Sequence, residues 1–235
     1  MHARSYETRH AGGDTLATHR HAGAYAALVV DGGHVETSID GTVACEPGTL
    51  LLHPRFHAHG NRFGDRGACV ANLCLPEGFV VPTVAVYRIE DVREASRVFA
   101  HAALDPLREL LAAARPLECE NNGGDWRPAF LQALRECDEP VGLIARRLGI
   151  SAAYASRALL RSHGMGPQAL RRELRWRRAL SLLSGDAPLA EVATQAGFAD
   201  QSHFNRIARA CSGMTPTQLR RQVKCVQDAP RSIAA

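Results

Sequence analysis

Two stretches of the chain, IARRLGISAAYASRALLRSHGMGPQALRR at 144–172 and VATQAGFADQSHFNRIARACSGMTPTQLRR at 192–221, are copies of one pattern with a single inserted residue. In each copy a run with apolar residues at helical spacing leads to a glycine, a polar residue follows, and a second run ends at Gly-Met with a proline two residues later. Two copies are too few for a solenoid, which needs at least three units to bury its faces. Each copy has two helical runs separated by a glycine-containing turn. This order predicts a helix-turn-helix, whose second helix enters the DNA major groove.

Capping residues and apolar spacing define the helices of this region. The predicted helices cover 141–148, 152–163, 167–184, 188–196 and 201–211. Gly149 and Gly197 can adopt the positive φ of a turn, and Ser151 and Asp200 are natural N-caps of the helices that follow. At 1.5 Å per residue the helix from 167 spans roughly 27 Å. With its neighbours, it is long enough to hold two recognition helices about one DNA turn, roughly 34 Å, apart.

The outward faces of the second helix in each copy carry the candidate DNA contacts. The predicted base-reading residues are Ala153, Ser156, Arg157, Gln201, Ser202, Asn205 and Arg206. Arginine pairs with guanine and Asn or Gln with adenine, each good pair discriminating by about 1–3 kcal/mol. Four arginines, Arg161, Arg171, Arg172 and Arg209, either bind phosphate or are merely solvated. Because the second copy carries more polar readers, we expect it to specify sequence and the first copy to anchor.

Charge is divided unevenly along the 235 residues. Residues 125–235 hold 17 basic residues against 9 acidic ones, whereas residues 1–124 hold 11 against 15. All basic side chains but one are arginines, which form paired hydrogen bonds with phosphate and guanine. The repeated half is thus the basic half, as a phosphate-binding surface requires. An ordinary surface whose arginines contact only solvent would carry the same charge.

The cysteines indicate a cellular compartment. They are seven in number, scattered and without a C-x-x-C pair, which favours reduced thiols in the cytosol. A basic leader with an apolar run behind it is absent, as is any apolar run approaching 18 residues, which argues against secretion and membrane insertion. We expect a cytoplasmic protein.

The first part of the chain is rich in short β-type runs. The runs lie at 24–30, 49–53 and 68–75, and turn signals lie at 31–33, 40–41, 47–48 and 64–67. Many short strands at such spacing indicate a sandwich or barrel. A helical pattern follows, with an apolar stripe made of Val92, Ala95, Phe99, Ala102, Ala103, Leu107, Leu110 and Leu111. The stripe either packs on its own domain or forms a dimer interface.

These patterns predict an α+β chain of two domains. The predicted parts are a β-rich sensor domain at 1–90, a helical segment at 91–115, a linker at 116–125, an all-α DNA-binding domain at 126–224 and a mobile tail at 225–235. No Ser/His/Asp, Cys/His or paired-carboxylate pattern stands out at a convincing spacing, which argues against an enzyme.

The C-terminal pattern resembles the signature of AraC/XylS-type transcriptional regulators over about 100 residues, from Trp126 to Lys224. The matching residues are Gly197, Phe198, Asp200, Gln201, Ser202, Phe204, Arg206, Gly213, Met214, Thr215, Pro216, Leu219 and Arg220, preceded by Arg175, Ala179, Leu182, Leu183 and Ala193. The resemblance implies a monomeric DNA-binding unit with two helix-turn-helices on a connecting helix, usually activating transcription. The chain departs from the family at Ala208, where phenylalanine is common, and at the equivalent Leu159; both positions are expected to face the core.

The N-terminal part resembles the small cupin-type β-barrel that many such regulators carry as a sensor. The resemblance rests on His19-x-His21, the Asp40-Gly41 turn, the segment 47–52, Pro54 and His59. Metal-binding cupins have a glutamate four residues after the His-x-His pair, a position that Tyr25 takes here. His19, His21 and His59 would suit zinc or another divalent metal. The preferred interpretation is that these three histidines and Tyr25 line a pocket for an organic effector.

The preferred hypothesis is a ligand-responsive transcription factor. Its acidic β domain would sense a small molecule, alter how the basic domain engages double-stranded promoter DNA, and lead to recruitment of RNA polymerase. Two alternatives stay open: a cupin metalloenzyme carrying a DNA-binding domain, and a constitutive DNA-binding protein whose barrel forms a homodimer.

Overall fold

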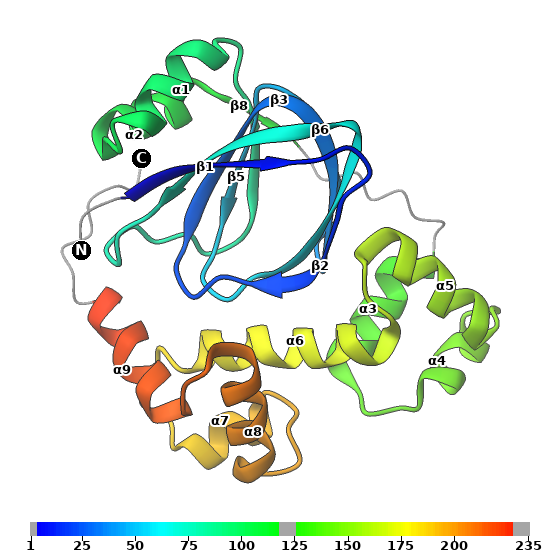
Figure 1. Cartoon of the computed structure of the whole chain (residues 1–235). Coiled ribbons are helices and arrows are strands. Elements are labelled where there is room, and N and C mark those ends of the chain that lie inside the picture. Colours follow the sequence, from blue (N-terminus) through cyan, green and yellow to red (C-terminus); the bar gives the residue numbers. More distant parts are fainter. Residues whose placement is uncertain (1–3, 118–125, 228–235) are drawn as a thin grey trace. The chain divides into compact units, whose positions relative to one another are not determined.

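The computed structural model describes residues 4–117 and 126–227, except for the side chains of 224–227. The chain divides into two compact units, residues 1–121 and 122–235, which are described one at a time. Among the described residues, the first unit holds the strands and two helices, and the second unit is helical (Figure 1). The predicted α+β architecture is therefore confirmed.

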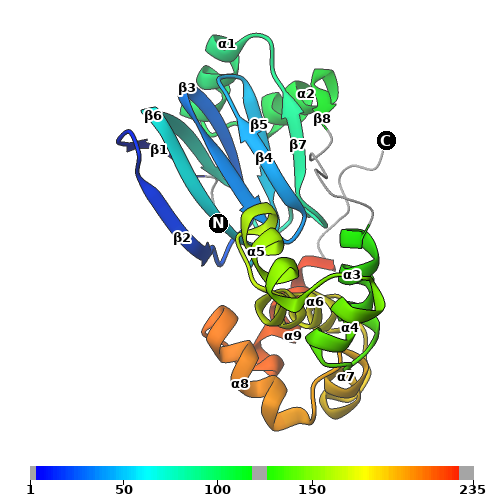
Figure 2. The ribbon, with the colours of Figure 1, turned by 90° about the vertical axis from the view of Figure 1, so that its right-hand side faces the viewer.

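The N-terminal unit is built on one antiparallel sheet (Figure 2). Its strands are β1 (Arg4–His10), β2 (Thr15–Arg20), β3 (Tyr25–Ser38), β4 (Gly41–Cys45), β5 (Thr49–His53), β6 (Ala58–Cys74), β7 (Ala85–Arg88) and β8 (Arg115–Leu117). The order is β1-β6-β3-β5-β7-β8, while β2 and β4 pair with the other parts of β6 and β3. The long strands β3 and β6 thus belong to two half-sheets. No pairing among the described residues closes the sheet into a barrel.

Two of the predicted turns are bends inside these long strands. Residues 31–33 lie within β3 and residues 64–67 within β6, and the register between the two strands shifts near this point. Gly32 has a φ of +70°, and a Cβ there would lie 2.1 Å from the carbonyl oxygen of Gly67. Only glycine fits such a close approach of two backbones. The other two turn signals do separate strands.

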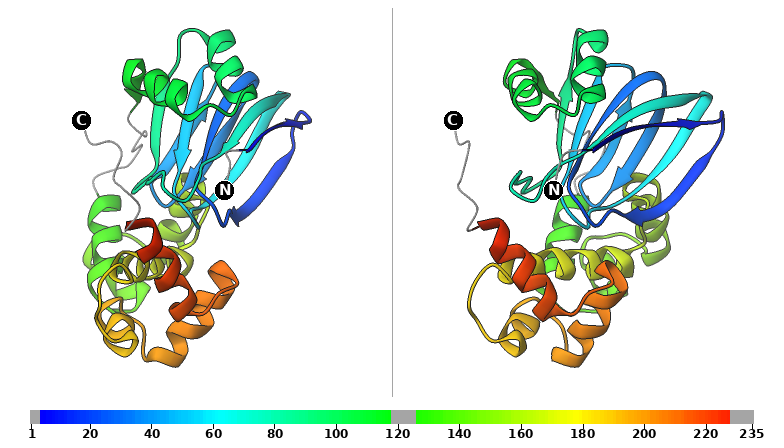
Figure 3. Two further views of the ribbon diagram at one scale, coloured as in Figure 1. Left: turned by 90° about the vertical axis from the view of Figure 1, so that its left-hand side faces the viewer. Right: turned by 60° about the vertical axis from the view of Figure 1, so that its left-hand side comes forward.

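The predicted apolar stripe forms two helices that pack on the sheet (Figure 3). They are α1 (Val92–Ala100) and α2 (Leu104–Ala113), separated near Ala102, which has a φ of +49°. The stripe residues Ala95, Phe99 and Leu107 are buried in one apolar cluster with Leu28, Leu50 and Leu73 of the strands. The stripe is therefore used within its own domain.

The C-terminal unit consists of seven helices within the described residues. They are α3 (Trp126–Glu136), α4 (Val141–Arg147), α5 (Ala152–His163), α6 (Pro167–Leu182), α7 (Leu189–Gln195), α8 (Gln201–Ser212) and α9 (Pro216–Gln227). The helices predicted for the two copies and their connector agree with these bounds to within two residues. Helix α6 packs against α3, α5 and α7, and its Trp176 is fully buried, a core position that sequence reasoning missed.

Two predicted boundaries are wrong at their edges. The linker expected at 116–125 starts too early, because Pro116 and Leu117 pair with β7 as part of β8. The tail expected at 225–235 also starts too early, because α9 continues to Gln227. Residues 118–125 and 228–235 lie outside the described residues. None of the described helices is long and apolar enough to cross a membrane.

Candidate DNA-contact surface and histidine cluster

The second helix of each copy begins with the same kind of cap. The Ser151 hydroxyl accepts a hydrogen bond from the backbone N–H three residues later at 3.1 Å, and the Asp200 carboxylate accepts the equivalent bond at 2.6 Å. Each turn before them contains a glycine with positive φ, 71° at Gly149 and 88° at Gly197. These side-chain caps satisfy backbone donors that have no partner within the helix. The local signals thus fix where α5 and α8 start.

The predicted base-reading residues lie on the open faces of these two helices. Ala153, Arg157, Gln201, Ser202 and Arg206 are exposed, and Ser156 and Asn205 are half-buried. The opposite faces hold the buried residues Ala155, Ala158, Leu159, Phe204 and Ala208. Each helix therefore presents a polar strip to solvent while its apolar side packs inward.

The four arginines predicted to bind phosphate fall into two classes. Arg161, Arg172 and Arg209 are exposed, as a phosphate contact requires. Arg171 is only 7% exposed, and its guanidinium donates to the backbone carbonyl of Glu139. The prediction for Arg171 is wrong, because its position on α6 turns it toward the preceding segment and the core.

The same arginine contact occurs in both copies. Arg220 stands at the position of the second copy that corresponds to Arg171, and it donates to the carbonyl of Ala187 at 2.6 Å. Both accepting carbonyls belong to the residue just before the proline that caps the first helix of the copy. In each copy, a hydrogen bond from this arginine therefore links the start of the helix-turn-helix to the helix that follows it. We call this contact the arginine clamp. Recurrence of Arg-Arg at 171–172 and 220–221 was the available sequence signal.

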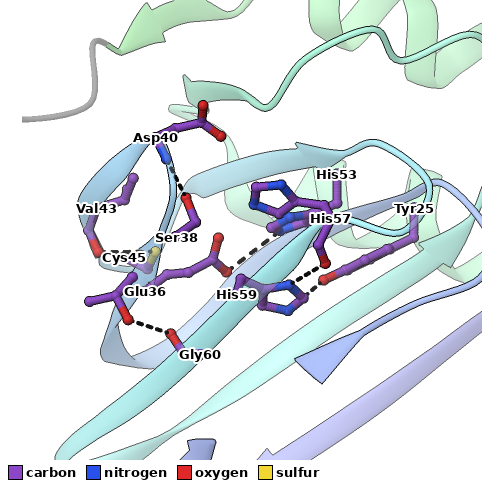
Figure 4. Close-up of polar contacts among 11 residues, drawn as sticks. Tyr25, Glu36, Ser38, Asp40, Val43, Cys45, His53, His57, His59 and Gly60 are labelled. Atoms are coloured by element: carbon purple, nitrogen blue, oxygen red, sulfur yellow. Dashed lines mark hydrogen bonds and ion pairs between the residues drawn. The ribbon is translucent and has the colours of Figure 1, made fainter. Parts of the chain in front are cut away.

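A group of polar side chains meets between the two half-sheets of the N-terminal unit (Figure 4). Along the β3–β6 pairing, Tyr25 lies opposite Cys74 at one end and His59 opposite Ser38 at the other. Nevertheless the Tyr25 hydroxyl lies 3.0 Å from Nε2 of His59. The bends in the two strands therefore fold the sheet so that the inner faces of its halves meet.

The histidines predicted from the sequence are part of this group. His19 on β2 lies directly opposite His59 on β6, and their ring centroids are 4.4 Å apart. The ring of His21 lies 5.4 Å from that of His59 and 4.6 Å from that of Tyr25. His19 and His21 are half-buried, whereas Tyr25 and His59 are buried.

Three further members, His53, His57 and Glu36, were missed by sequence reasoning. His53 lies opposite Tyr25 on β5, and its Nε2 is 3.6 Å from Oε2 of Glu36. The rings of His53 and His57 lie 4.8 and 5.7 Å from that of His59. The spacing of the histidines at 53, 57 and 59 was a usable signal, whereas nothing local marks Glu36 as a partner.

Burial favours the neutral forms of four of these groups, His53, His59, Glu36 and Tyr25. It lowers the pKa of His59 to about 2 and, with help from the neighbouring histidines, holds the pKa of His53 well below its usual value. Burial likewise raises the pKa of Glu36 to about 8, with Asp40 adding to the effect, and raises the pKa of Tyr25 well above its usual value. Desolvation disfavours the charged form in each case.

Two sets of three histidines have nitrogens within 4.8 Å of one another. The first is the predicted set His19, His21 and His59, and the second is His53, His57 and His59. Three imidazoles are a usual ligand set for zinc and related dications. In the predicted set, Tyr25 takes the place of the expected carboxylate and hydrogen-bonds to His59 instead. Both sets share His59, so one ion uses one set or the other.

Residues 144–222 match a family described as "Helix-turn-helix domain". The matched region starts in α4, ends in α9, and contains both capped helices and the connector α6. The chain carries an AraC-type helix-turn-helix domain. No curated protein sequence matches the chain.

Several solved structures are similar to the chain at low identity. ToxT from Vibrio cholerae O395 has a TM-score of 0.43 and 11% identity, over 94% of this chain and 98% of that one. The C-terminal domain of AraT, a response regulator from Geobacillus stearothermophilus, has a TM-score of 0.39 and 25% identity, over 42% of this chain and 85% of that one. At these scores the likenesses say nothing about this chain's ligand.

Within the AraC-type domain, the two departures from the family pattern are core positions. Leu159 and Ala208 are both fully buried, at 0% exposure, as predicted. Their side chains contribute to packing beneath α5 and α8. The polar faces of the two helices are thus unaffected by these departures.

Proposed function

We propose that the chain is a sequence-specific transcription regulator that reads promoter DNA with α5 and α8 and senses a small molecule with its N-terminal sheet. The observation that carries this proposal is the pair of capped helices in the AraC-type domain, each with polar residues on its open face. A helix that presents such residues at its N-terminal part suits the major groove. The excess of arginine in this half of the chain supports phosphate contacts.

The two helices have different parts in this proposal. On α8, Gln201, Asn205 and Arg206 offer amide and guanidinium groups that pair with adenine and guanine edges. On α5, Arg157 is the principal hydrogen-bonding side chain, with Ser156 beside it and Ala153 available for thymine methyl groups. We therefore assign most of the sequence choice to α8 and an anchoring role to α5.

The histidine cluster supports the sensing part of the proposal. His19 and His21 are half-buried, while Tyr25 and His59 lie behind them in the interior. A polar effector that enters between the half-sheets would find hydrogen-bonding groups from β2, β3 and β6 together. Binding there would change how the two half-sheets pack, and this change is the proposed input to DNA binding and RNA polymerase recruitment.

The assignment of base reading can be tested on a DNA site that the purified full chain selects from a random pool. The selected site then serves as the binding probe. On the selected site, Arg206→Ala should weaken binding by about 1–3 kcal/mol, with little change on random DNA. Arg161→Ala should weaken binding to both DNAs and reduce the slope of log affinity against log salt by about 0.9. Arg66→Ala, an exposed arginine of the sheet unit, is the control and should change neither. Equal losses on both DNAs for Arg206→Ala would refute the assignment of base reading to α8.

Transcription from a promoter that contains the selected site tests the regulatory step. Addition of the purified chain to RNA polymerase and this template should raise the yield of transcript, whereas Arg206→Ala should abolish the increase. A reduced yield would show repression, and an unchanged yield would refute a regulatory role at this site.

A further inference from the structure

The second histidine set is the more deeply buried of the two. His53 ends β5, His57 precedes β6, and His59 lies near the start of β6, so a short loop brings the three side chains together. They are 1%, 3% and 3% exposed, and their nitrogens lie within 4.8 Å of one another. Three imidazoles taken out of water at one place need hydrogen-bonding or metal partners to offset the loss of hydration.

His53 shows which of its nitrogens is available for a ligand. Its Nε2 faces Oε2 of Glu36 at 3.6 Å, whereas its Nδ1 is buried without a hydrogen-bond partner. Metal-bound histidines usually donate their second ring N–H to a carboxylate, which fixes the tautomer and orients the ring. In that tautomer the proton of His53 is on Nε2, and Nδ1 carries a free lone pair.

His59 is held in a complementary way. Its Nδ1 lies 3.4 Å from the carbonyl oxygen of His57, and its Nε2 lies 3.0 Å from the Tyr25 hydroxyl. When Nδ1 donates to the carbonyl, Nε2 is the acceptor of the Tyr25 O–H bond. A metal ion at Nε2 would therefore take the place of the Tyr25 hydroxyl and of no other contact of His59.

The predicted set lacks this support. His19 and His21 are half-buried, and neither has a carboxylate partner among the described residues. The Nδ1 of His19 faces the carbonyl of Ala17 at 2.9 Å instead. The second set combines full burial, a carboxyl group 3.6 Å from one ring nitrogen and a buried nitrogen without a hydrogen-bond partner.

We propose that His53, His57 and His59 bind one transition-metal dication of the zinc class, with Glu36 positioning His53. A set of three neutral imidazoles suits such ions, and the fourth position is left for water or a small ligand. Zinc–nitrogen bonds of about 2.0–2.1 Å require the three nitrogens to close to roughly 3.3 Å from one another, a movement within reach of side-chain rotation. The sheet domain is then a metal-binding domain.

Titration with Co²⁺ tests this proposal on the full chain after removal of metal with a chelator. We expect one equivalent to bind and to produce the visible absorption of a nitrogen-coordinated ion without the near-ultraviolet band of a thiolate ligand. That second observation matters because the chain has seven cysteines. Failure of the wild-type chain to bind Co²⁺ or Zn²⁺, or a spectrum with a thiolate band, would overturn the proposal.

Matched substitutions separate the two histidine sets. His53→Gln and His57→Gln should abolish the Co²⁺ signal, whereas His19→Gln and His21→Gln should leave it unchanged. The opposite result would assign the ion to His19, His21 and His59 and refute the proposal. Circular dichroism of each variant shows whether it is folded, and a loss counts only in a folded variant; the His19 and His21 variants can refute the proposal by themselves.

Two further variants test the neighbours of the ion. Glu36→Gln should weaken metal binding by about 10–100-fold, the usual effect of losing a carboxylate behind a ligating histidine. Tyr25→Phe removes the hydroxyl that competes for Nε2 of His59 and should bind the metal at least as tightly as the wild type. Weaker binding by Tyr25→Phe would show that the hydroxyl is itself a ligand, contrary to the proposed geometry.

Discussion

Replacing Arg171 by alanine should destabilise the C-terminal unit by about 3 kcal/mol, even though the arginine belongs to the basic half of the chain. Its guanidinium donates to the Glu139 carbonyl, and a hydrogen bond with a charged donor contributes about 1.5–3 kcal/mol. The side chain is 7% exposed, so its removal also leaves unfilled volume in the core. The adjacent Arg172 is exposed, and Arg172→Ala should change the free energy of unfolding by less than about 0.5 kcal/mol.

Tryptophan fluorescence during urea unfolding measures this difference in the relevant unit. The two tryptophans of the chain, Trp126 and Trp176, both belong to the C-terminal unit, so their signal reports its unfolding separately from the sheet. With a urea slope of about 2 kcal/mol/M, a loss of 3 kcal/mol lowers the midpoint by about 1.5 M. The Arg172→Ala midpoint should stay close to that of the wild type.

In DNA binding, the same two variants should show the reverse order of effects, with Arg172→Ala the more affected. If Arg172 contacts phosphate, Arg172→Ala should reduce the slope of log affinity against log salt by about 0.9. Arg171→Ala should keep the wild-type slope under conditions where it is folded. If Arg171→Ala left the urea midpoint unchanged and reduced the salt slope, the stabilising role of the Arg171 hydrogen bond would be refuted. That result would support a contact of Arg171 with phosphate instead.

Two further predictions concern the sheet unit, both followed by far-ultraviolet circular dichroism during urea unfolding. Gly32→Ala should lower the free energy of unfolding by more than about 2 kcal/mol, because its φ is +70° and the new Cβ would overlap the Gly67 carbonyl. The control Gly23→Ala has open space around it and should have little effect; equal effects would contradict the close approach. Burial, with a smaller effect of His10, lowers the pKa of His34 to about 4, so this histidine stays neutral in the fold at pH values where the unfolded chain is protonated. His34 should therefore contribute up to about 3 kcal/mol to the loss of stability between pH 6.5 and pH 4, and His34→Leu should reduce the total loss; an unchanged pH dependence would rule out this contribution of His34.

Local signals were sufficient to predict the helices of the C-terminal unit. Ser151 and Asp200 cap α5 and α8, and the glycines two or three residues earlier adopt the positive φ that the turns need. A cap acts within a few residues of its own position, so the sequence contains the information directly. The inward position of Arg171 was not predicted because arginine is usually exposed. The helical period nevertheless places Arg171 beside Leu170 and Leu174 on a buried face.

The sheet was harder to predict because distant strands decide its details. The Asp-Gly-Gly segment at 31–33 has the composition of a turn, but pairing with β6 on both sides makes it a bend within one long strand. The histidine cluster shows the same limit. The sequence pointed to His19, His21 and His59, whereas Glu36 lies beside His53 only because the folded sheet brings its two half-sheets together.

Strands β3 and β6 each run through both half-sheets. Because the two half-sheets share these strands, we expect them to unfold together and the amide protons on both sides of the bends to exchange with solvent at a common free energy. A ligand or ion that binds among the histidines would then slow exchange throughout the β3–β6 ladder. Binding at a small interior site would then stabilise the entire sheet.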